Sequence, residues 1–118
     1  ESGVLDAGYS FKQRFEGEPG TNPEELIGAA HASCFSMALS MILGEKGYTA
    51  DAIDTQARVT LSQSDAGFDI SSIHLDVEAS VSGADDAAFQ EAAETAKANC
   101  PVSKVLKADI TMSAKLKG

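Results

Sequence analysis

The longest hydrophobic segment of the chain, residues 26–43, contains no formally charged side chain. Its length and composition are typical of a helix that is apolar on most faces. Asn22 and Pro23 precede it as a suitable N-cap and first helical residue, and Gly47 follows as a suitable stop. We therefore predict a long helix that begins at Pro23 and runs to about Lys46.

Alternation of apolar and polar residues marks the segments that we predict to be strands. A period of two is typical of a strand that is covered on one face. The predicted strands are residues 9–16, 56–64, 68–81 and 108–116. A turn at residues 64–67 separates the second from the third, so we expect these two to pair as a hairpin.

Residues 85–99 are rich in alanine and carry apolar residues on one side, which predicts a second amphipathic helix. Pro101 ends this helix and can begin a short one that runs to residue 107. The predicted order is β-α-β-β-α-α-β with a meander of antiparallel strands. This is an α+β arrangement, and 118 residues indicate one domain over residues 1–118.

Two stripes along the long helix bear on the oligomeric state. One stripe is apolar: Ile27, Ala30, Cys34, Met37, Ala38 and Met41. The other is small and weakly polar: Ala29, Ser33, Ser36, Ser40 and Gly44. Small residues let another helix approach closely, and one small sheet cannot cover a helix that is apolar on most faces. We therefore expect a second subunit and a homodimer.

The charge of the chain limits its partners. There are 18 acidic and 9 basic residues, for a net charge of −9, which argues against nucleic acid or an anionic membrane. The 26–43 segment approaches the length of a membrane span, roughly 18 apolar residues, but His31 and three serines dilute it. No signal-like segment opens the chain, so we expect a cytoplasmic protein. Its start at Glu1 suggests that an N-terminal piece is missing.

The two cysteines point more directly to chemistry than any other residues. Cys34 lies in the middle of the apolar helix, where burial would raise its pKa. Cys100 directly precedes Pro101, where the N–H groups of a short helix would favour a thiolate. On these local grounds Cys100 is the more activated thiol. A two-thiol redox site, a structural disulfide and two inert core residues all remain open.

Cys34 could react only if the fold brought a cation to it. The chain has two arginines, and Arg14 lies on the predicted strand just before the long helix. Glu24, in the first turn of that helix, could hold Arg14 by a bidentate ion pair. Glu24 could equally serve as an acid that complements the helix N-terminus.

Other classes of site have no matching motif. A metal site would have to combine His31, Cys34, Cys100 and His74, whose spacing lacks the paired ligands of known zinc motifs. His31 is instead expected to be a hydrogen-bonded residue of the core. The glycines match neither a dinucleotide fingerprint nor a phosphate loop. We therefore expect no metal and no cofactor.

Two long segments, TNPEELIGAAHASCFSMALS and CPVSKVLKA, resemble the osmotically inducible protein C / organic hydroperoxide resistance (OsmC/Ohr) family. RFEG and the DAGF turn are similar to the same family, so the resemblance covers nearly the whole chain. It is closer to the osmotically inducible branch. The resemblance implies a thiol-dependent peroxidase that reduces organic hydroperoxides to alcohols. An external dithiol, with lipoyl-type dithiols among the candidates, would regenerate it.

The resemblance also implies roles for four residues. The peroxidatic cysteine falls on Cys34 and the resolving cysteine on Cys100, which reverses the local ranking. Arg14 of RFEG would stabilise the Cys34 thiolate, and Glu24 would orient Arg14. The alternative function is a non-enzymatic binding or structural domain with a permanent disulfide between the two cysteines.

The fold implied by the resemblance is an intertwined α+β homodimer. Antiparallel sheets wrap around two long helices that are buried in the dimer, in agreement with the apolar 26–43 segment. Relatives normally carry another strand or hairpin ahead of the position of Glu1, so we expect this chain to lack that element.

Overall fold

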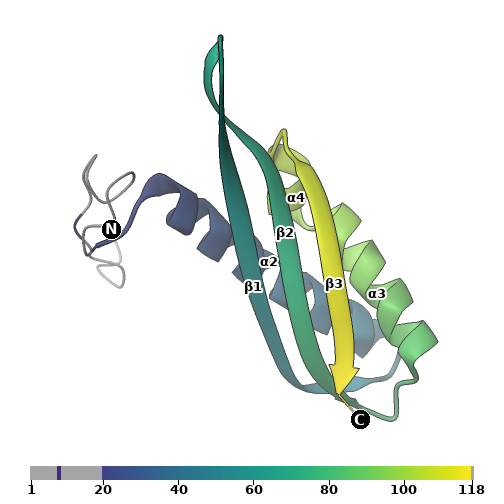
Figure 1. The fold of residues 1–118 in the computed structure, drawn as a ribbon. Helices are drawn as coiled ribbons and strands as arrows, with labels where there is room; N and C mark the ends of the chain where they lie inside the picture. The colour runs from purple at the N-terminus through teal and green to yellow at the C-terminus, as the bar shows by residue number, and fades with distance from the viewer. Residues whose placement is uncertain (1–7, 9–19, 118) are drawn as a thin grey trace.

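Two layers make up the part of the chain that the computed structural model describes, namely residue 8 and residues 20–117 (Figure 1). A three-stranded sheet forms one layer, and the helices pack on one of its faces. The elements, in chain order, are α2 (Pro23–Glu45), β1 (Thr49–Ser64), β2 (Gly67–Ser82), α3 (Asp86–Asn99), α4 (Pro101–Val105) and β3 (Asp109–Lys117). The predicted strand 9–16, with Arg14, lies outside the described residues.

Both ends of α2 follow from local chemistry. The Asn22 side chain accepts a hydrogen bond from the Glu25 amide at 2.8 Å, which satisfies one of the free N–H groups of the first turn. At the other end Gly47 adopts a φ of +86°, a left-handed conformation that glycine takes without strain. The predicted start and stop of this helix are confirmed.

The hairpin of β1 and β2 is antiparallel and turns through Gly67, whose φ is +116°. β1 begins at Thr49, well before the predicted start at residue 56. Its early part is rich in alanine and aspartate, which have low strand propensity. Pairing with β2 over the whole hairpin, from Thr49 with Ser82 onward, overrides that local preference.

β3 lies parallel to β2, from the pair Ser72 and Asp109 to the pair Ser80 and Lys117. The predicted antiparallel meander is therefore wrong for this strand. The reason lies in the connection, because α3 and α4 carry the chain back along the sheet before β3 begins (Figure 1). Such a helical crossover returns a strand in the same direction. The α+β class is confirmed.

The core lies between the sheet and the helices. Alternate residues of β2 point toward the helices, and Leu75 among them is fully buried. Phe35 of α2 and Phe89 of α3 pack into the same core. Gly28 lets α2 approach β1, because a Cβ atom at this position would lie 3.3 Å from Val59 Cγ2.

The buried face of α2 differs from the predicted apolar stripe. It consists of Gly28, His31, Phe35, Leu39 and Leu43. Met37 and Met41 are 74% and 62% exposed. Ser36 of the small stripe contacts β1 of the same chain, because its hydroxyl lies 2.7 Å from Thr55 Oγ1. The sheet and two neighbouring helices, α3 and α4, thus cover one side of α2 and leave much of the helix exposed within this chain.

Candidate active site

Cys34 and Cys100 lie side by side although they are far apart in the sequence. Cys34 projects from the middle of α2, and Cys100 is the residue that joins α3 to α4. Both are free thiols, and their side chains are hydrogen-bonded to each other. Cys100 is fully buried, whereas Cys34 is partly exposed. The fold therefore forms a thiol pair of which Cys34 is the more accessible member.

Opposite pKa shifts distinguish the two thiols. Burial raises the pKa of Cys34, and the hydrogen bond to Cys100 raises it further, against a weaker effect of the Val102 amide. Burial also acts to raise the pKa of Cys100. Hydrogen bonds from the Cys34 thiol, from the amide and hydroxyl of Ser103, and from the Val102 amide outweigh that effect, so the pKa of Cys100 is lowered.

After the first ionisation, the pair holds one proton between its two sulfurs. The first proton leaves the pair with the negative charge mainly on Cys100, and the Cys34 S–H donates to it. The local sequence likewise indicated that Cys100 is the more activated of the two thiols. Within the pair, both burial and the contact with Cys100 therefore favour the neutral thiol of Cys34.

Two further residues complete the surroundings of the pair. His31 is fully buried, and its Nε2 lies 2.7 Å from the Ser103 hydroxyl oxygen, so the expected hydrogen-bonded core histidine is confirmed. Burial lowers the pKa of His31, so the ring is neutral at pH 7. Sequence reasoning connected His31 to the thiols only through the metal site that it disfavoured, and it assigned no role to Ser103. Their spacing, three residues before Cys34 and three after Cys100, was the available signal.

The predicted partners of Cys34 are only partly within the described residues. Glu24 lies in the first turn of α2, half-buried, where it lines a hollow between this helix and β1. Arg14 lies outside the described residues, so its predicted pairing with Glu24 stays a prediction. The other arginine, Arg58, forms an ion pair with Asp76 at 2.8 Å on the open face of the sheet.

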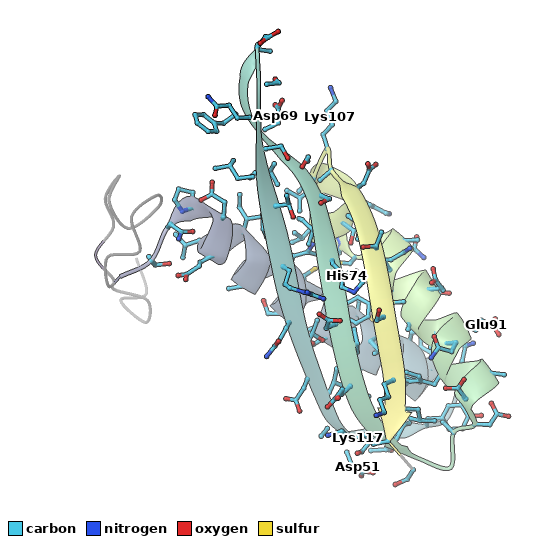
Figure 2. The ribbon with its side chains drawn as sticks, viewed as in Figure 1. Asp51, Asp69, His74, Glu91, Lys107 and Lys117 are labelled. Atoms are coloured by element: carbon cyan, nitrogen blue, oxygen red, sulfur yellow. The ribbon has the colours of Figure 1, made fainter. Side chains whose placement is uncertain are left out.

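His74 also lies on the open face of the sheet, the face that the helices do not cover (Figure 2). Its Nδ1 lies 2.7 Å from Thr111 Oγ1, and its Nε2 lies 3.2 Å from Asp76 Oδ1. The structure does not bring His74 to the cysteines. Among the described residues, no group of three or more His, Cys, Asp or Glu side chains could hold a metal ion.

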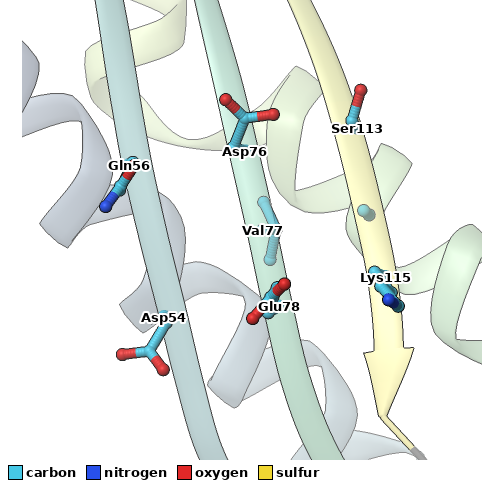
Figure 3. Close-up of a pocket in the computed structure, with 8 residues that line it drawn as sticks. Asp54, Gln56, Asp76, Val77, Glu78, Ser113 and Lys115 are labelled. Atoms are coloured by element: carbon cyan, nitrogen blue, oxygen red, sulfur yellow. The ribbon is translucent and has the colours of Figure 1, made fainter.

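The hollow drawn in Figure 3 lies on this same open face. Asp54, Asp76, Glu78, Ser113 and Lys115 line it, and the helices lie behind the strands. Neither cysteine is part of its lining. Charged side chains facing water are the ordinary outer surface of a sheet that is covered on one side.

Comparison with known proteins decides the family. The family model described as "OsmC-like protein" matches residues 15–115. The chain belongs to the OsmC family. Over 118 residues it is 59% identical to a protein named Peroxiredoxin OsmC from Escherichia coli (strain K12), with 99% of this chain and 82% of the relative covered. It is also 31% identical to the organic hydroperoxide resistance protein OhrB of Bacillus subtilis (strain 168), with 99% and 85% covered.

Solved structures of the OsmC family share the fold. The crystal structure of Bacillus subtilis OhrB matches with a TM-score of 0.72 at 29% identity, covering 98% of this chain and 84% of that chain. An OsmC-like protein from Vibrio cholerae matches with a TM-score of 0.77 at 16% identity, covering 91% and 75%. The likeness at this lower identity supports the fold alone.

Proposed function

We propose that this protein is a peroxidase that reduces organic hydroperoxides to alcohols with a pair of cysteine thiols. The observation that carries the proposal is the contact between two free thiols, of which the partly exposed one can meet a substrate. Relatives named as a peroxiredoxin and as organic hydroperoxide resistance proteins support the same chemistry.

In the first step the Cys34 thiolate attacks the terminal oxygen of the hydroperoxide. A sulfur–oxygen bond forms and the oxygen–oxygen bond breaks. The alkoxide leaves with the electron pair and takes up a proton to become the alcohol. Cys34 is then a sulfenic acid. The accessibility of Cys34 supports this assignment. Cys100 has the lower pKa of the two thiols, but it is fully buried and cannot meet the hydroperoxide.

In the second step the Cys100 thiolate attacks the sulfur of the Cys34 sulfenic acid. A disulfide bond forms, the sulfur–oxygen bond breaks, and hydroxide leaves and takes up a proton to become water. The hydrogen bonds that lower the pKa of Cys100 favour the thiolate that this step needs. An external dithiol then reduces the disulfide by thiol–disulfide exchange.

We also propose that the protein acts as a homodimer in the cytoplasm. The support is the exposed face of α2, where Met37 and Met41 are largely uncovered within this chain. α2 is long and apolar enough to cross a membrane, but core helices of soluble proteins meet the same criterion. The packing of Phe35 and Leu39 of α2 in the core favours the latter.

The function can be tested in a single turnover. The reduced protein receives one equivalent of an organic hydroperoxide, and intact-mass and peptide-mass analysis follow the two cysteines. We expect stoichiometric alcohol and a Cys34–Cys100 disulfide that a mild dithiol reopens. A disulfide that resists the dithiol, with no alcohol formed, would support the non-enzymatic domain instead.

Arg14→Ala is expected to raise the pKa of Cys34 by more than about one pH unit, because an opposite charge nearby stabilises a thiolate by this amount or more. Peroxide reduction at neutral pH should slow in proportion to the lost thiolate. Glu24→Ala should also raise the pKa of Cys34, but by less, because Glu24 only orients Arg14. The pH dependence of Cys34 alkylation, in a Cys100→Ser background, measures both.

Two matched variants control for this prediction. Arg58→Ala removes the other arginine from the open face of the sheet, and Glu25→Ala removes the exposed acid next to Glu24. Neither should change Cys34 alkylation. An alkylation profile that Arg14→Ala leaves unmoved would exclude Arg14 as the activating cation.

A further inference from the structure

His31 is an unusual residue for its position in the fold. It lies on the buried face of α2 beside Phe35 and Leu39, and its exposed fraction is 0%. Among the described residues it is the one polar or charged side chain in the core. Burying a polar ring costs free energy unless its hydrogen bonds are satisfied, so a specific partner is expected.

The partner of His31 is Ser103 of α4, at 2.7 Å from Nε2 to Oγ. The same serine is hydrogen-bonded through its hydroxyl to Cys100. Ser103 therefore lies between the ring of His31 and the sulfur of Cys100. His31 belongs to α2, whereas Cys100 and Ser103 lie at the start of α4 and within it. The fold brings these distant segments together.

The number of protons on each group decides which group donates and which accepts in these hydrogen bonds. A serine hydroxyl has one proton to donate and can accept from another group at the same time. A thiolate only accepts, so the Ser103 proton must point to Cys100 whenever Cys100 is ionised. Oγ then accepts from His31, which requires the proton of the neutral ring to lie on Nε2.

The remaining ring nitrogen agrees with this assignment. Within the part of the chain that the structure describes, Nδ1 of His31 is buried without a hydrogen-bond partner. With the proton on Nε2, Nδ1 is an acceptor, and a buried acceptor without a partner is tolerated more often than a buried N–H. The opposite tautomer would bury an unpaired N–H and leave Ser103 to donate toward the ring.

We propose that His31 is a positioning residue that holds the Ser103 hydroxyl as a hydrogen-bond donor to the Cys100 sulfur. The proposal deepens the function proposed above and rests on it for its role in turnover. There, the chain from His31 through Ser103 supplies a charge-assisted hydrogen bond to the resolving thiolate before it attacks the Cys34 sulfenic acid.

The serine is tested first, because it lies on a short, partly exposed helix. In a Cys34→Ser background the ultraviolet absorbance of the thiolate reports the ionisation of Cys100 without requiring access to it. Ser103→Ala is expected to raise the pKa of Cys100 by about one pH unit, the value of one hydrogen bond to a charged group. Ser103→Thr keeps the hydroxyl and should restore the lower pKa.

A matched control is Ser33→Ala on α2, because the Ser33 hydroxyl donates only to carbonyls of its own helix, at 2.8 and 3.1 Å. It should leave the pKa of Cys100 unchanged. A pKa that Ser103→Ala also leaves unchanged would overturn the proposal.

The role of His31 is tested by a double-mutant cycle with Ser103, in which the pKa of Cys100 is measured. His31→Leu should raise the pKa of Cys100 when Ser103 is present and have no further effect in Ser103→Ala, because it acts through that hydroxyl. His31→Gln offers an amide N–H and should restore part of the loss. Additive effects of His31→Leu and Ser103→Ala would mean that His31 acts independently. If His31→Leu does not fold, as judged by circular dichroism, the same comparison is made with His31→Gln.

These titrations contain no peroxide, so they can refute the hydrogen-bond proposal independently of the proposed function. In protein with both cysteines, Ser103→Ala should slow disulfide formation several-fold at neutral pH, because less of Cys100 is ionised. A shifted Cys100 pKa in a protein that consumes no peroxide would refute the function and keep the hydrogen-bond chain.

Discussion

Cys34→Ser is expected to abolish the consumption of organic hydroperoxides, with a loss of more than about a thousandfold. The substitution removes the proposed nucleophile and nearly keeps the size of the side chain, so folding should be preserved. Cys100 cannot substitute, because it is fully buried behind α2 although its pKa is the lower of the two. The measurement is peroxide loss with excess dithiol, alongside circular dichroism.

The companion variant, Cys100→Ser, should behave differently. It should complete one peroxide reduction and stop at the Cys34 sulfenic acid, because no neighbouring thiol remains to displace hydroxide. A dimedone-type reagent that reacts with sulfenic acids should label Cys34 in this variant. Equally fast labelling of Cys100 in the Cys34→Ser protein would reverse the assignment of the two thiols.

The double variant Met37→Glu, Met41→Glu should dissociate and destabilise the protein. Both side chains are largely exposed on α2 in the single chain, and we expect a second subunit to cover them. Placing carboxylates from both subunits in an apolar interface costs several kcal/mol. Subunit folding then loses its partner, and we expect the midpoint of thermal unfolding to fall by more than about 10 °C.

Sedimentation of the wild-type protein at micromolar concentration, with thermal unfolding at several concentrations, provides the measurement. A dimer should show a midpoint that rises with protein concentration. Ala87→Glu, an exposed alanine on α3, is the control for adding a carboxylate to a helix. A stable, active wild-type monomer would contradict the prediction, as would a double variant as stable as the control.

The sequence predicted those elements whose signals are local. The ends of α2 follow from Asn22, Pro23 and Gly47, each of which acts on the backbone within one turn. The direction of β3 did not follow, because alternation specifies a strand and its exposed face but not its partner. The buried stripe of α2 was also misplaced, because on a helix with apolar residues all round the sheet decides which face packs.

The site was predictable in part for the same reason. Each cysteine has a local signal, and the family resemblance paired them, but their contact depends on how α2 crosses α4. The link from His31 to Ser103 joins two elements that are far apart in the chain. Neither a histidine in an apolar helix nor a serine shortly after a proline indicates a partner by itself, and only the packing reveals that the two meet.

The shared proton of the two thiols has a consequence for the reduction potential of their disulfide. Because the pKa of Cys100 is lowered and that of Cys34 is raised, an interval of pH lies between them in which the reduced pair holds a single proton. Reduction there takes up two electrons and one proton, so the potential falls by about 30 mV per pH unit. With two ordinary thiols the slope would be about twice as steep. A dithiol with two ordinary thiols keeps the steeper slope, so its reduction of the oxidised pair should become more favourable by about 30 mV per pH unit as the pH rises across that interval.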